Sequence, residues 1–321
     1  MLREKILSGN KPIHLYGFSP PKAGNSLERN REIASKQIER IDAMKIDGIV
    51  LYDIQDEPGR TSSPRPFAFL PTLDPLKYSR DLLAGTRVPK IIYKRVAGET
   101  QETLGAWLSH FDNAKNEDLV VLVGSPIAGK PQAHEGTLTL KEACRFAAQF
   151  HPTLCLGGVA IAERHTDKRN EQDRLFAKYL DGCRFFVTQT VYDVISSKAL
   201  IADYARRFSE AGQKAPPLLF SFSPCGSVKT MEFMQWLGIR FPSWLQSELR
   251  YATNILGRSI DLCIEIADEL AVFAKDHGVP TGFNVESVSI RQEEIDASCV
   301  LLQKLIDGPF KVGQYPNTSS H

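Results

Sequence analysis

Residues Leu154–Asp193 read LCLGGVAIAERHTDKRNEQDRLFAKYLDGCRFFVTQTVYD, which is the pattern of strand, polar turn, helix and second strand. The two apolar runs, Leu154–Ile161 and Phe185–Val191, have the composition of parallel strands that are covered on both faces. The second run contains the polar pair Thr188-Gln189 near its end. Because chemistry in α/β barrels concentrates at the C-terminal ends of strands, we expect a functional site at this edge of the sheet.

The same alternation of short apolar runs and amphipathic segments extends over most of the 321 residues. The strand candidates are Ile13–Phe18, Gly48–Ile54, Lys90–Lys94, Leu119–Val123, Leu154–Ile161, Phe185–Val191, Leu218–Phe222 and Gly282–Val288. Eight strands that are each followed by a helix predict an α/β protein with a single (β/α)8 TIM barrel over residues 1–310. The alternative, a doubly wound open sheet, more often has a Gly-rich first turn, and none follows Ile13–Phe18. Residues 311–321 are expected to form a disordered tail.

Two segments depart from a regular repeat. Gly59–Leu73 is a loop rich in Pro and Ser after the second strand, and its length suggests a functional loop. Arg240–Ala274 has two helical patterns where one would suffice, which predicts an extra helix between the seventh and eighth strands. The surface of these two helices is a candidate contact for a homo-oligomer.

The composition favours an enzyme-sized globular protein of the cytoplasm. Apolar residues make up 42% and charged residues 24% of the chain, and the net charge of +1 argues against a nucleic-acid partner. We expect no signal peptide and no membrane span, because no apolar run is long enough for either. The six cysteines form no C-x-x-C pair, which favours reduced core thiols and no metal site.

The segment Gly124–Lys130, GSPIAGK, has the spacing of a phosphate-binding P-loop. However, Pro131 stands where that motif needs a Ser or Thr to hold magnesium, so we do not expect an NTPase. Gly124 and Ser125 follow the fourth strand directly, and their backbone can still approach a ligand there.

Several ionisable or polar residues stand near predicted strand ends. Asp53, Asp56 and Glu57 follow the second strand, where a carboxyl group can serve as a general acid or form part of a solvated turn. Gln189 and Glu286 lie within strands, and such groups are costly to bury unless they meet a ligand or complete an internal hydrogen-bond network.

Five pieces of the chain, in order, resemble the methylenetetrahydrofolate reductase family. GFSPPK at Gly17–Lys22 is similar to the family's first-strand motif, and Val121–Pro131 is similar to its Arg-Gly-Asp turn with a Gly-Lys-Pro ending. GGVAIAERH, which ends at His165, resembles the Tyr-Pro-Glu-x-His segment, and Arg240–Leu245 resembles Arg-Ile-Pro-x-Trp. The fifth piece keeps the family's spacing at Glu171, Lys178, Gly182, Thr188, Gln189 and Asp193.

The resemblance implies a TIM barrel that reduces the methylene group of a reduced folate to methyl, with NAD(P)H as the electron source. It implies that Gln189 and Thr188 bind the substrate, with the carboxamide of Gln189 pairing with the pterin edge. It also implies a bound FAD; the residues that would contact this cofactor are Gly124, Ser125, His165, Glu171 and Lys178.

The sequence also departs from the family at two ionisable positions. Gly17 replaces the first-strand Glu that opens the bridged folate ring, and Ser125 replaces the Asp of Arg-Gly-Asp. A missing general acid costs on the order of 10²–10⁴ in rate. The substitute acid is therefore sought in Asp56 or Glu57, and next in Glu286, because the first and last strands of a closed barrel adjoin.

The hydride can reach the folate in two ways, directly from nicotinamide or through a bound FAD. The acidic cluster after the second strand and the Glu in the last strand resemble a mycobacterial branch that uses nicotinamide without flavin. The retained His165, Glu171 and Lys178 slightly favour a bound FAD. Two other functions stay open: a catalytically silent barrel that binds folate or flavin as a partner subunit, and a related enzyme of methyl transfer or demethylation.

Overall fold

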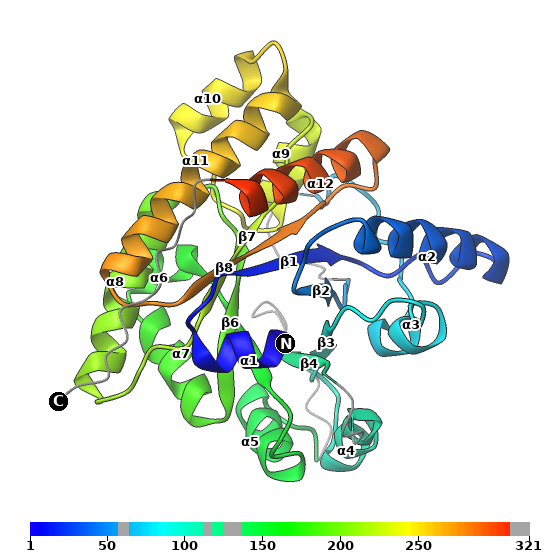
Figure 1. The fold of residues 1–321 in the computed structure, drawn as a ribbon, viewed down its shortest axis with the longest axis vertical. Coiled ribbons are helices and arrows are strands. Elements are labelled where there is room, and N and C mark those ends of the chain that lie inside the picture. The colour runs from blue at the N-terminus through cyan, green and yellow to red at the C-terminus, as the bar shows by residue number, and fades with distance from the viewer. Residues whose placement is uncertain (57–63, 112–116, 125–135, 309–321) are drawn as a thin grey trace.

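The computed structural model describes residues 1–56, 64–111, 117–124 and 136–308, and these residues form a closed barrel of parallel strands (Figure 1). The strands follow one another around the barrel in chain order, and the last pairs with the first. Their bounds are β1 (Ile13–Phe18), β2 (Gly48–Leu51), β3 (Lys90–Arg95), β4 (Leu119–Val123), β5 (Leu156–Ala160), β6 (Cys183–Thr190), β7 (Leu218–Phe222) and β8 (Thr281–Glu286). The predicted (β/α)8 architecture is confirmed, and the open-sheet alternative is excluded. The tail at 311–321 lies outside the described residues.

Helices surround the barrel. Their bounds are α1 (Leu2–Ser8), α2 (Leu27–Asp42), α3 (Pro75–Asp81), α4 (Gln101–Leu108), α5 (Leu140–Phe150), α6 (Ala162–Lys168), α7 (Glu171–Leu180), α8 (Val194–Glu210), α9 (Val228–Trp236), α10 (Ser243–Tyr251), α11 (Ile255–Asp276) and α12 (Gln292–Asp307). The two helices expected within Arg240–Ala274 are α10 and α11, and α9 precedes them, so three helices separate β7 from β8. The sequence predicts one extra helix between β7 and β8, whereas the structure has two.

Local sequence fixes where several helices begin. The side chains of Ser26, Asp74, Thr139, Asp193 and Ser227 each accept a hydrogen bond from a backbone N–H in the first turn of the helix that follows. Such caps satisfy donors that have no partner inside the helix. All five caps lie in connections that lead from a strand to the next helix, at the C-terminal end of the barrel.

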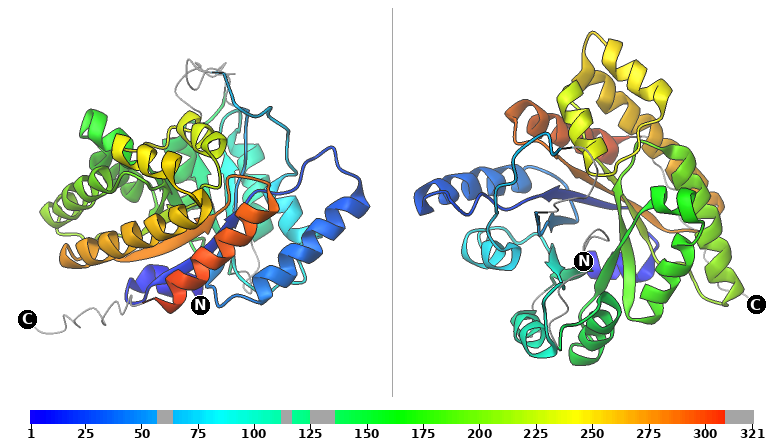
Figure 2. Two further views of the ribbon diagram at one scale, coloured as in Figure 1. Left: turned by 90° about the horizontal axis from the view of Figure 1, so that it is seen from above. Right: turned by 180° about the vertical axis from the view of Figure 1, so that it is seen from behind.

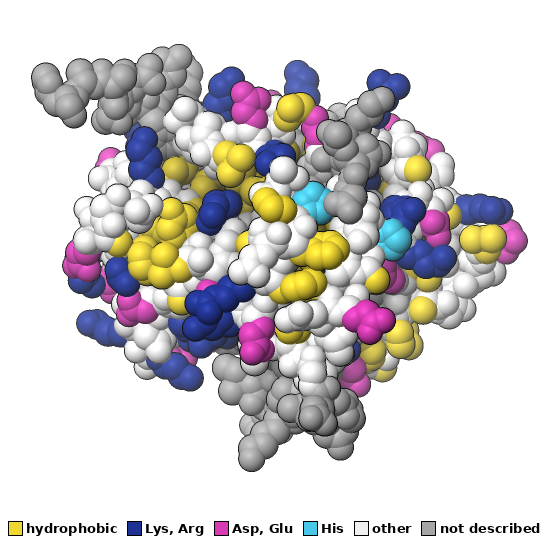
Figure 3. Space-filling model, turned by 90° about the horizontal axis from the view of Figure 1, so that it is seen from below, with side chains coloured by type: hydrophobic (Ala, Val, Ile, Leu, Met, Phe, Trp, Pro, Cys, Tyr) yellow, Lys and Arg dark blue, Asp and Glu magenta, His cyan; other side chains and the backbone are white. Residues whose placement is uncertain are grey.

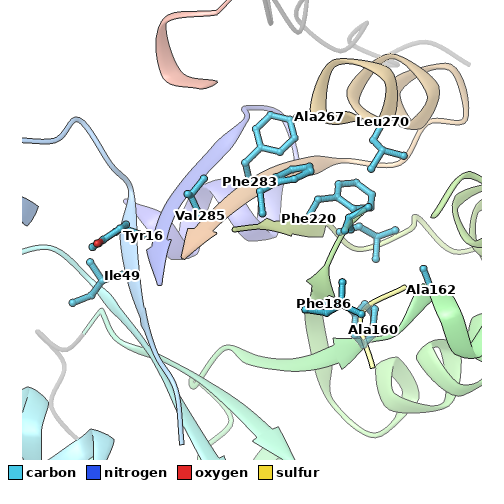
Figure 4. Close-up of a cluster of buried hydrophobic side chains, with 14 of the residues drawn as sticks. Tyr16, Ile49, Ala160, Ala162, Phe186, Phe220, Ala267, Leu270, Phe283 and Val285 are labelled. Atoms are coloured by element: carbon cyan, nitrogen blue, oxygen red, sulfur yellow. The ribbon is translucent and has the colours of Figure 1, made fainter. Parts of the chain in front are cut away.

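The core has two shells, one inside the barrel and one between the barrel and its helices. Leu15, Val50 and Val121 belong to the inner shell, and Leu2 and Ile6 of α1 pack into it from the N-terminal end of the strands. Figure 4 shows part of the outer shell, where Phe186, Phe220 and Phe283 turn outward toward the surrounding helices. Because α1 packs against one end, we look for a ligand site at the opposite end, where the strands finish.

The C-terminal end of the barrel, here called the mouth, faces the reader in the right-hand view of Figure 2. There α9 and the segment 64–73 lie near each other at the rim. The flank that carries α4 and α5, shown in Figure 3, has apolar side chains scattered among charged ones. None of the helices among the described residues is both long enough and apolar enough to span a bilayer.

Candidate functional site

A layer of polar side chains lies above the apolar filling of the barrel, at the mouth. Glu286, at the end of β8, accepts a hydrogen bond from Thr190 Oγ1 of β6 at 2.9 Å, and the hydroxyl of Tyr52 interacts with the same carboxyl group and lowers its pKa. Asn284 Nδ2 donates to Tyr52 Oη at 2.6 Å and to Ser221 Oγ at 3.0 Å. We call these five residues the mouth layer. Their side chains join β2, β6, β7 and β8 across the barrel.

Glu286 carries the ionisable acid of this layer. Burial raises the pKa of its carboxyl group, and the hydrogen bonds from Thr190 and Tyr52 lower it by less. Burial also raises the pKa of Tyr52 far above that of a free phenol, so the hydroxyl stays neutral. A carboxyl group with a raised pKa keeps its proton to higher pH than an unperturbed one and can donate it to a ligand.

The acidic cluster after β2 is less enclosed than Glu286. Asp53 Oδ2 accepts from the backbone N–H of Arg95 at 2.9 Å, and its Oδ1 accepts from Gln55, so it ties this turn to β3. Asp56 is exposed at the rim. Glu57 lies outside the described residues. Of the three predicted acids, Glu286 is therefore the one that the described structure places inside the mouth.

The neighbouring residues Thr188 and Gln189 have different environments. The strand pairing between β6 and β7 shifts register between Val187 and Thr190. Within this irregularity Thr188 Oγ1 accepts from the backbone N–H of Ser221 at 3.0 Å, which is a bond within the sheet. Gln189 Nε2 donates to the backbone carbonyl of Leu237 at 2.6 Å, so the side chain reaches from the strand end to the end of α9.

Three of the five residues expected to contact FAD, namely His165, Glu171 and Lys178, bond within the protein. Glu171 is fully buried; its carboxylate accepts from the backbone N–H of Ile161 at 3.1 Å and pairs with Arg174 at 3.2 Å. Lys178 Nζ donates to the backbone carbonyl of Val159 at 2.5 Å, and burial lowers its pKa.

His165 is equally enclosed, with Nε2 at 3.0 Å from Asp203 Oδ2 on α8. Gly124 is half-buried at the end of β4, and Ser125 lies outside the described residues. His165, Glu171 and Lys178 thus each bond within the fold, although Nδ1 of His165 is buried without a hydrogen-bond partner among the described residues. Their contact with a flavin stays a prediction.

A second feature of the mouth, absent from the sequence interpretation, joins the segment after β2 to α9. We call it the Arg65 cluster; its members are Arg65, Phe67, Phe69, Lys229, Phe233 and Trp236. The guanidinium carbon of Arg65 lies 4.8 Å from the Trp236 ring centroid and 5.6 Å from that of Phe233. Lys229 Nζ lies 4.7 Å from the ring of Phe67, which is 41% exposed.

The Arg65 cluster carries positive charge without carboxylate partners among the described residues. Neither Arg65 nor Lys229 forms an ion pair in the described part of the chain, and Arg65 Nε is buried with no hydrogen-bond partner there. Aromatic rings beside two such cations suit a ligand that has an aromatic ring and an anionic end.

The sequence interpretation missed Tyr52, Asn284 and Ser221 as well as the Arg65 cluster. A period of two along β7 and β8 could have placed Ser221 and Asn284 inside the barrel, since both are polar residues in otherwise apolar strands. All six cysteines are free thiols. In the described ranges, no three His, Cys, Asp or Glu side chains gather in a way that could hold a metal ion.

Among solved structures, the chain is similar to a protein from Clostridium thermocellum that binds two copies of 5-methyl-5,6,7,8-tetrahydrofolic acid. The two sequences are 37% identical, the TM-score is 0.82, and the match covers 95% of this chain and 99% of the other. No protein-family model matches the sequence. No curated protein matches it either.

Proposed function

This chain belongs to the same family as the Clostridium thermocellum folate-binding protein, and from that premise we propose that it binds a reduced folate at the barrel mouth and reduces its methylene group to methyl. The observation that carries the proposal is the methyl folate bound by a relative that is 37% identical over 95% of the chain. Methyltetrahydrofolate is the product of such a reduction. The resemblance of the sequence to methylenetetrahydrofolate reductases supports the same reaction.

The two features of the mouth fit the two ends of a folate. The pterin edge presents paired donors and acceptors, which suit the mouth layer and the carboxamide of Gln189. The p-aminobenzoyl ring can stack on the exposed ring of Phe67, and the glutamate carboxylates can pair with Arg65 and Lys229. Both ends can be held because the mouth layer and the Arg65 cluster both lie at the C-terminal end of the barrel.

The chemistry needs one proton and one hydride. The methylene bridge opens to an iminium when a ring nitrogen is protonated, and Glu286 is the described acid inside the mouth that can donate this proton. Asp56 at the rim and Glu57, outside the described residues, stay predicted alternatives for the same role. Reduced nicotinamide supplies the hydride, and the enclosed positions of His165, Glu171 and Lys178 support transfer without flavin.

The test is an absorbance spectrum of the purified protein, followed by anaerobic oxidation of NADH and NADPH with and without methylenetetrahydrofolate. We expect a colourless protein that oxidises one of the nucleotides only when the folate is present. A flavin spectrum that NADH bleaches and the folate restores would replace direct transfer by the flavin mechanism. A protein that binds methyltetrahydrofolate in calorimetry but oxidises neither nucleotide would refute the reductase.

A second candidate function, folate binding for methyl transfer or as a silent partner subunit, is favoured by Gly17. The family's first-strand acid is absent at this position, and the relative binds the methyl form of the cofactor. Incubation with methyltetrahydrofolate and a thiol acceptor, followed by detection of demethylated folate, separates transfer from simple binding.

A further inference from the structure

The side chain of Tyr52 fills the space next to Gly17, which has no side chain of its own. Gly17 in β1 lies beside Val50 of β2 and Glu286 of β8 in the strand register. A Cβ atom built on Gly17 would lie 2.8 Å from Tyr52 Oη and 3.0 Å from Asn284 Oδ1. Real Cβ atoms essentially never approach a neighbour more closely than 3.0 Å. The phenol of Tyr52 therefore occupies the space where a side chain from position 17 would begin.

The hydroxyl of Tyr52 is held firmly in that space. It accepts from Asn284 Nδ2 at 2.6 Å, and its ring meets the ring of Tyr93 edge to face with centroids 5.0 Å apart. The same hydroxyl interacts with the carboxyl group of Glu286 and lowers its pKa. Since Asn284 donates into the phenol oxygen, the phenol proton is available to the carboxylate.

We propose that Tyr52 and Glu286 together replace the first-strand acid that Gly17 lacks, with Glu286 as the proton donor and Tyr52 as the residue that positions it. The inference rests on the proposed reduction of a methylene folate. In that reaction the Glu286 proton moves to a ring nitrogen of the folate, and the carbon–nitrogen bond of the bridge breaks to give an iminium. The hydride from reduced nicotinamide then completes the methyl group. Solvent returns a proton to the carboxylate, which Tyr52 and Thr190 stabilise by donating hydrogen bonds.

The surroundings of Glu286 fit an acid that works by burial and hydroxyl contacts alone. In the described part of the chain it faces Thr190 from β6, Tyr52 from β2 and Tyr93 from β3, and none of these carries a positive charge. Burial raises the pKa of Glu286, and the Tyr52 bond lowers it. Removing the Tyr52 hydroxyl should therefore raise that pKa further and weaken the carboxylate that remains after proton transfer.

The first test is Tyr52→Phe, with Tyr16→Phe as the matched control. Tyr16 is a buried tyrosine on β1 whose hydroxyl faces Ser298 of α12 at 3.4 Å, away from the mouth. We expect Tyr52→Phe to lower kcat about 10-fold to 100-fold, with the dissociation constant of methyltetrahydrofolate within about twofold of the original. The alkaline limb of the pH–rate profile should move to higher pH, and Tyr16→Phe should change none of these quantities.

The second test removes the side chain of Tyr52 and places a carboxyl group at position 17 instead. Tyr52→Ala removes the phenol and makes room above Gly17, and Gly17→Glu then restores a carboxyl group from β1. We expect the double variant Gly17→Glu/Tyr52→Ala to be at least about 10-fold faster than Tyr52→Ala, whereas Gly17→Ala/Tyr52→Ala should not recover. Gly17→Glu alone should be unstable because the two side chains compete for one space.

The outcomes separate this inference from the proposed function. If the original protein binds methyltetrahydrofolate but never oxidises nicotinamide, the reductase fails, and the pH dependence of folate affinity then tests the pair by itself. That dependence should have its midpoint at the pKa of Glu286 and should move upward in Tyr52→Phe. Unchanged turnover and an unchanged midpoint in Tyr52→Phe would overturn the inference, whichever function the protein has.

Discussion

The mouth layer and the flank behind β5 each contain an enclosed glutamate, but Glu286 is half-buried, Glu171 is fully buried, and their carboxyl groups have opposite surroundings. Glu171 has a backbone N–H and two guanidinium groups, those of Arg164 and Arg174, around its carboxylate. Glu286 has only hydroxyl partners, from Thr190 and Tyr52, among the residues that the structure describes. A buried carboxylate that is fully paired holds helices to the barrel, whereas one without a cation tends to keep its proton.

The largest expected effect is on catalysis by Glu286→Gln. The amide keeps the size of the side chain and removes the proton donor, so kcat should fall on the order of 10²–10⁴. The affinity for methyltetrahydrofolate should fall much less than kcat, because the amide can still hydrogen-bond to the pterin and binding requires no proton transfer. Anaerobic oxidation of NAD(P)H measures the first quantity, and calorimetry measures the second.

Asp56→Asn in the same assays decides between the enclosed acid and the rim. We expect less than about a threefold change, since Asp56 is exposed at the rim and does not face the interior of the mouth. A loss of about 100-fold or more in Asp56→Asn, with Glu286→Gln active, would move the acid to the rim and reverse the comparison.

Replacement of Glu171 is expected to lower the stability of the protein and to leave its folate binding unchanged. Replacement by Ala removes the hydrogen bond to the Ile161 N–H and leaves the Arg164 and Arg174 guanidinium groups without this partner, so the free energy of unfolding should fall by about 2–3 kcal/mol. The folate affinity of the folded protein should stay the same. Urea unfolding measures the difference.

Asp173→Ala is the matched control for Glu171→Ala on α7. Its ion pair with Arg207 is largely exposed, and such pairs contribute only about 0–1 kcal/mol. A similar loss of stability in both variants would mean that the buried network at Glu171 is not special.

A smaller effect is expected on the pH dependence of the free energy of unfolding, to which Glu286 contributes. Because burial raises the pKa of Glu286, the folded state binds more protons than the unfolded state between the two pKa values. The contribution of Glu286 to stability is therefore fully present below the unfolded pKa and is lost as pH rises through the folded pKa. Each pKa unit corresponds to about 1.4 kcal/mol.

Glu286→Gln should abolish this pH dependence and become more stable than the original protein on the alkaline side. Urea unfolding at a series of pH values, with Asp56→Asn as the exposed control, measures the difference in slope. Parallel curves for the original protein and Glu286→Gln would show that Glu286 titrates normally.

Much of the fold was predictable because strand composition is a local property. The apolar runs indicated eight parallel strands, and the closed barrel followed from their number and spacing. The additional helix α9 was missed because its apolar residues do not stand out as a separate period from those of the segments around it.

The candidate site was predictable only in part. Gly17 was recognised as a departure from the family, but its partner Tyr52 was not, because a contact between neighbouring strands depends on register. Glu286 was found since a carboxyl group in an apolar strand is conspicuous by itself. His165, Glu171 and Lys178 matched the family by spacing, and spacing gives no indication of whether a side chain faces a ligand or another helix.

The smallest effects are expected at two adjacent residues, Thr188 and Gln189. Thr188 makes a hydrogen bond within the sheet, whereas Gln189 lies at the mouth. Gln189 uses its amide nitrogen on the Leu237 carbonyl, and its amide oxygen makes no hydrogen bond to the described residues. Gln189→Leu should therefore weaken binding of methyltetrahydrofolate by about 10-fold, which is about 1.4 kcal/mol, because a ligand N–H loses its acceptor.

Thr188→Val is the control that completes this last comparison. The valine keeps the shape of Thr188 and removes the acceptor for the Ser221 N–H, so the free energy of unfolding should fall by about 1 kcal/mol while folate affinity stays within about twofold. Calorimetric titration of both variants measures folate affinity, and urea unfolding measures stability. We expect Gln189→Leu to change mainly the first and Thr188→Val mainly the second. If Gln189→Leu loses stability and keeps its affinity, Gln189 belongs with Glu171 as a structural residue, and pterin recognition must come from the mouth layer alone.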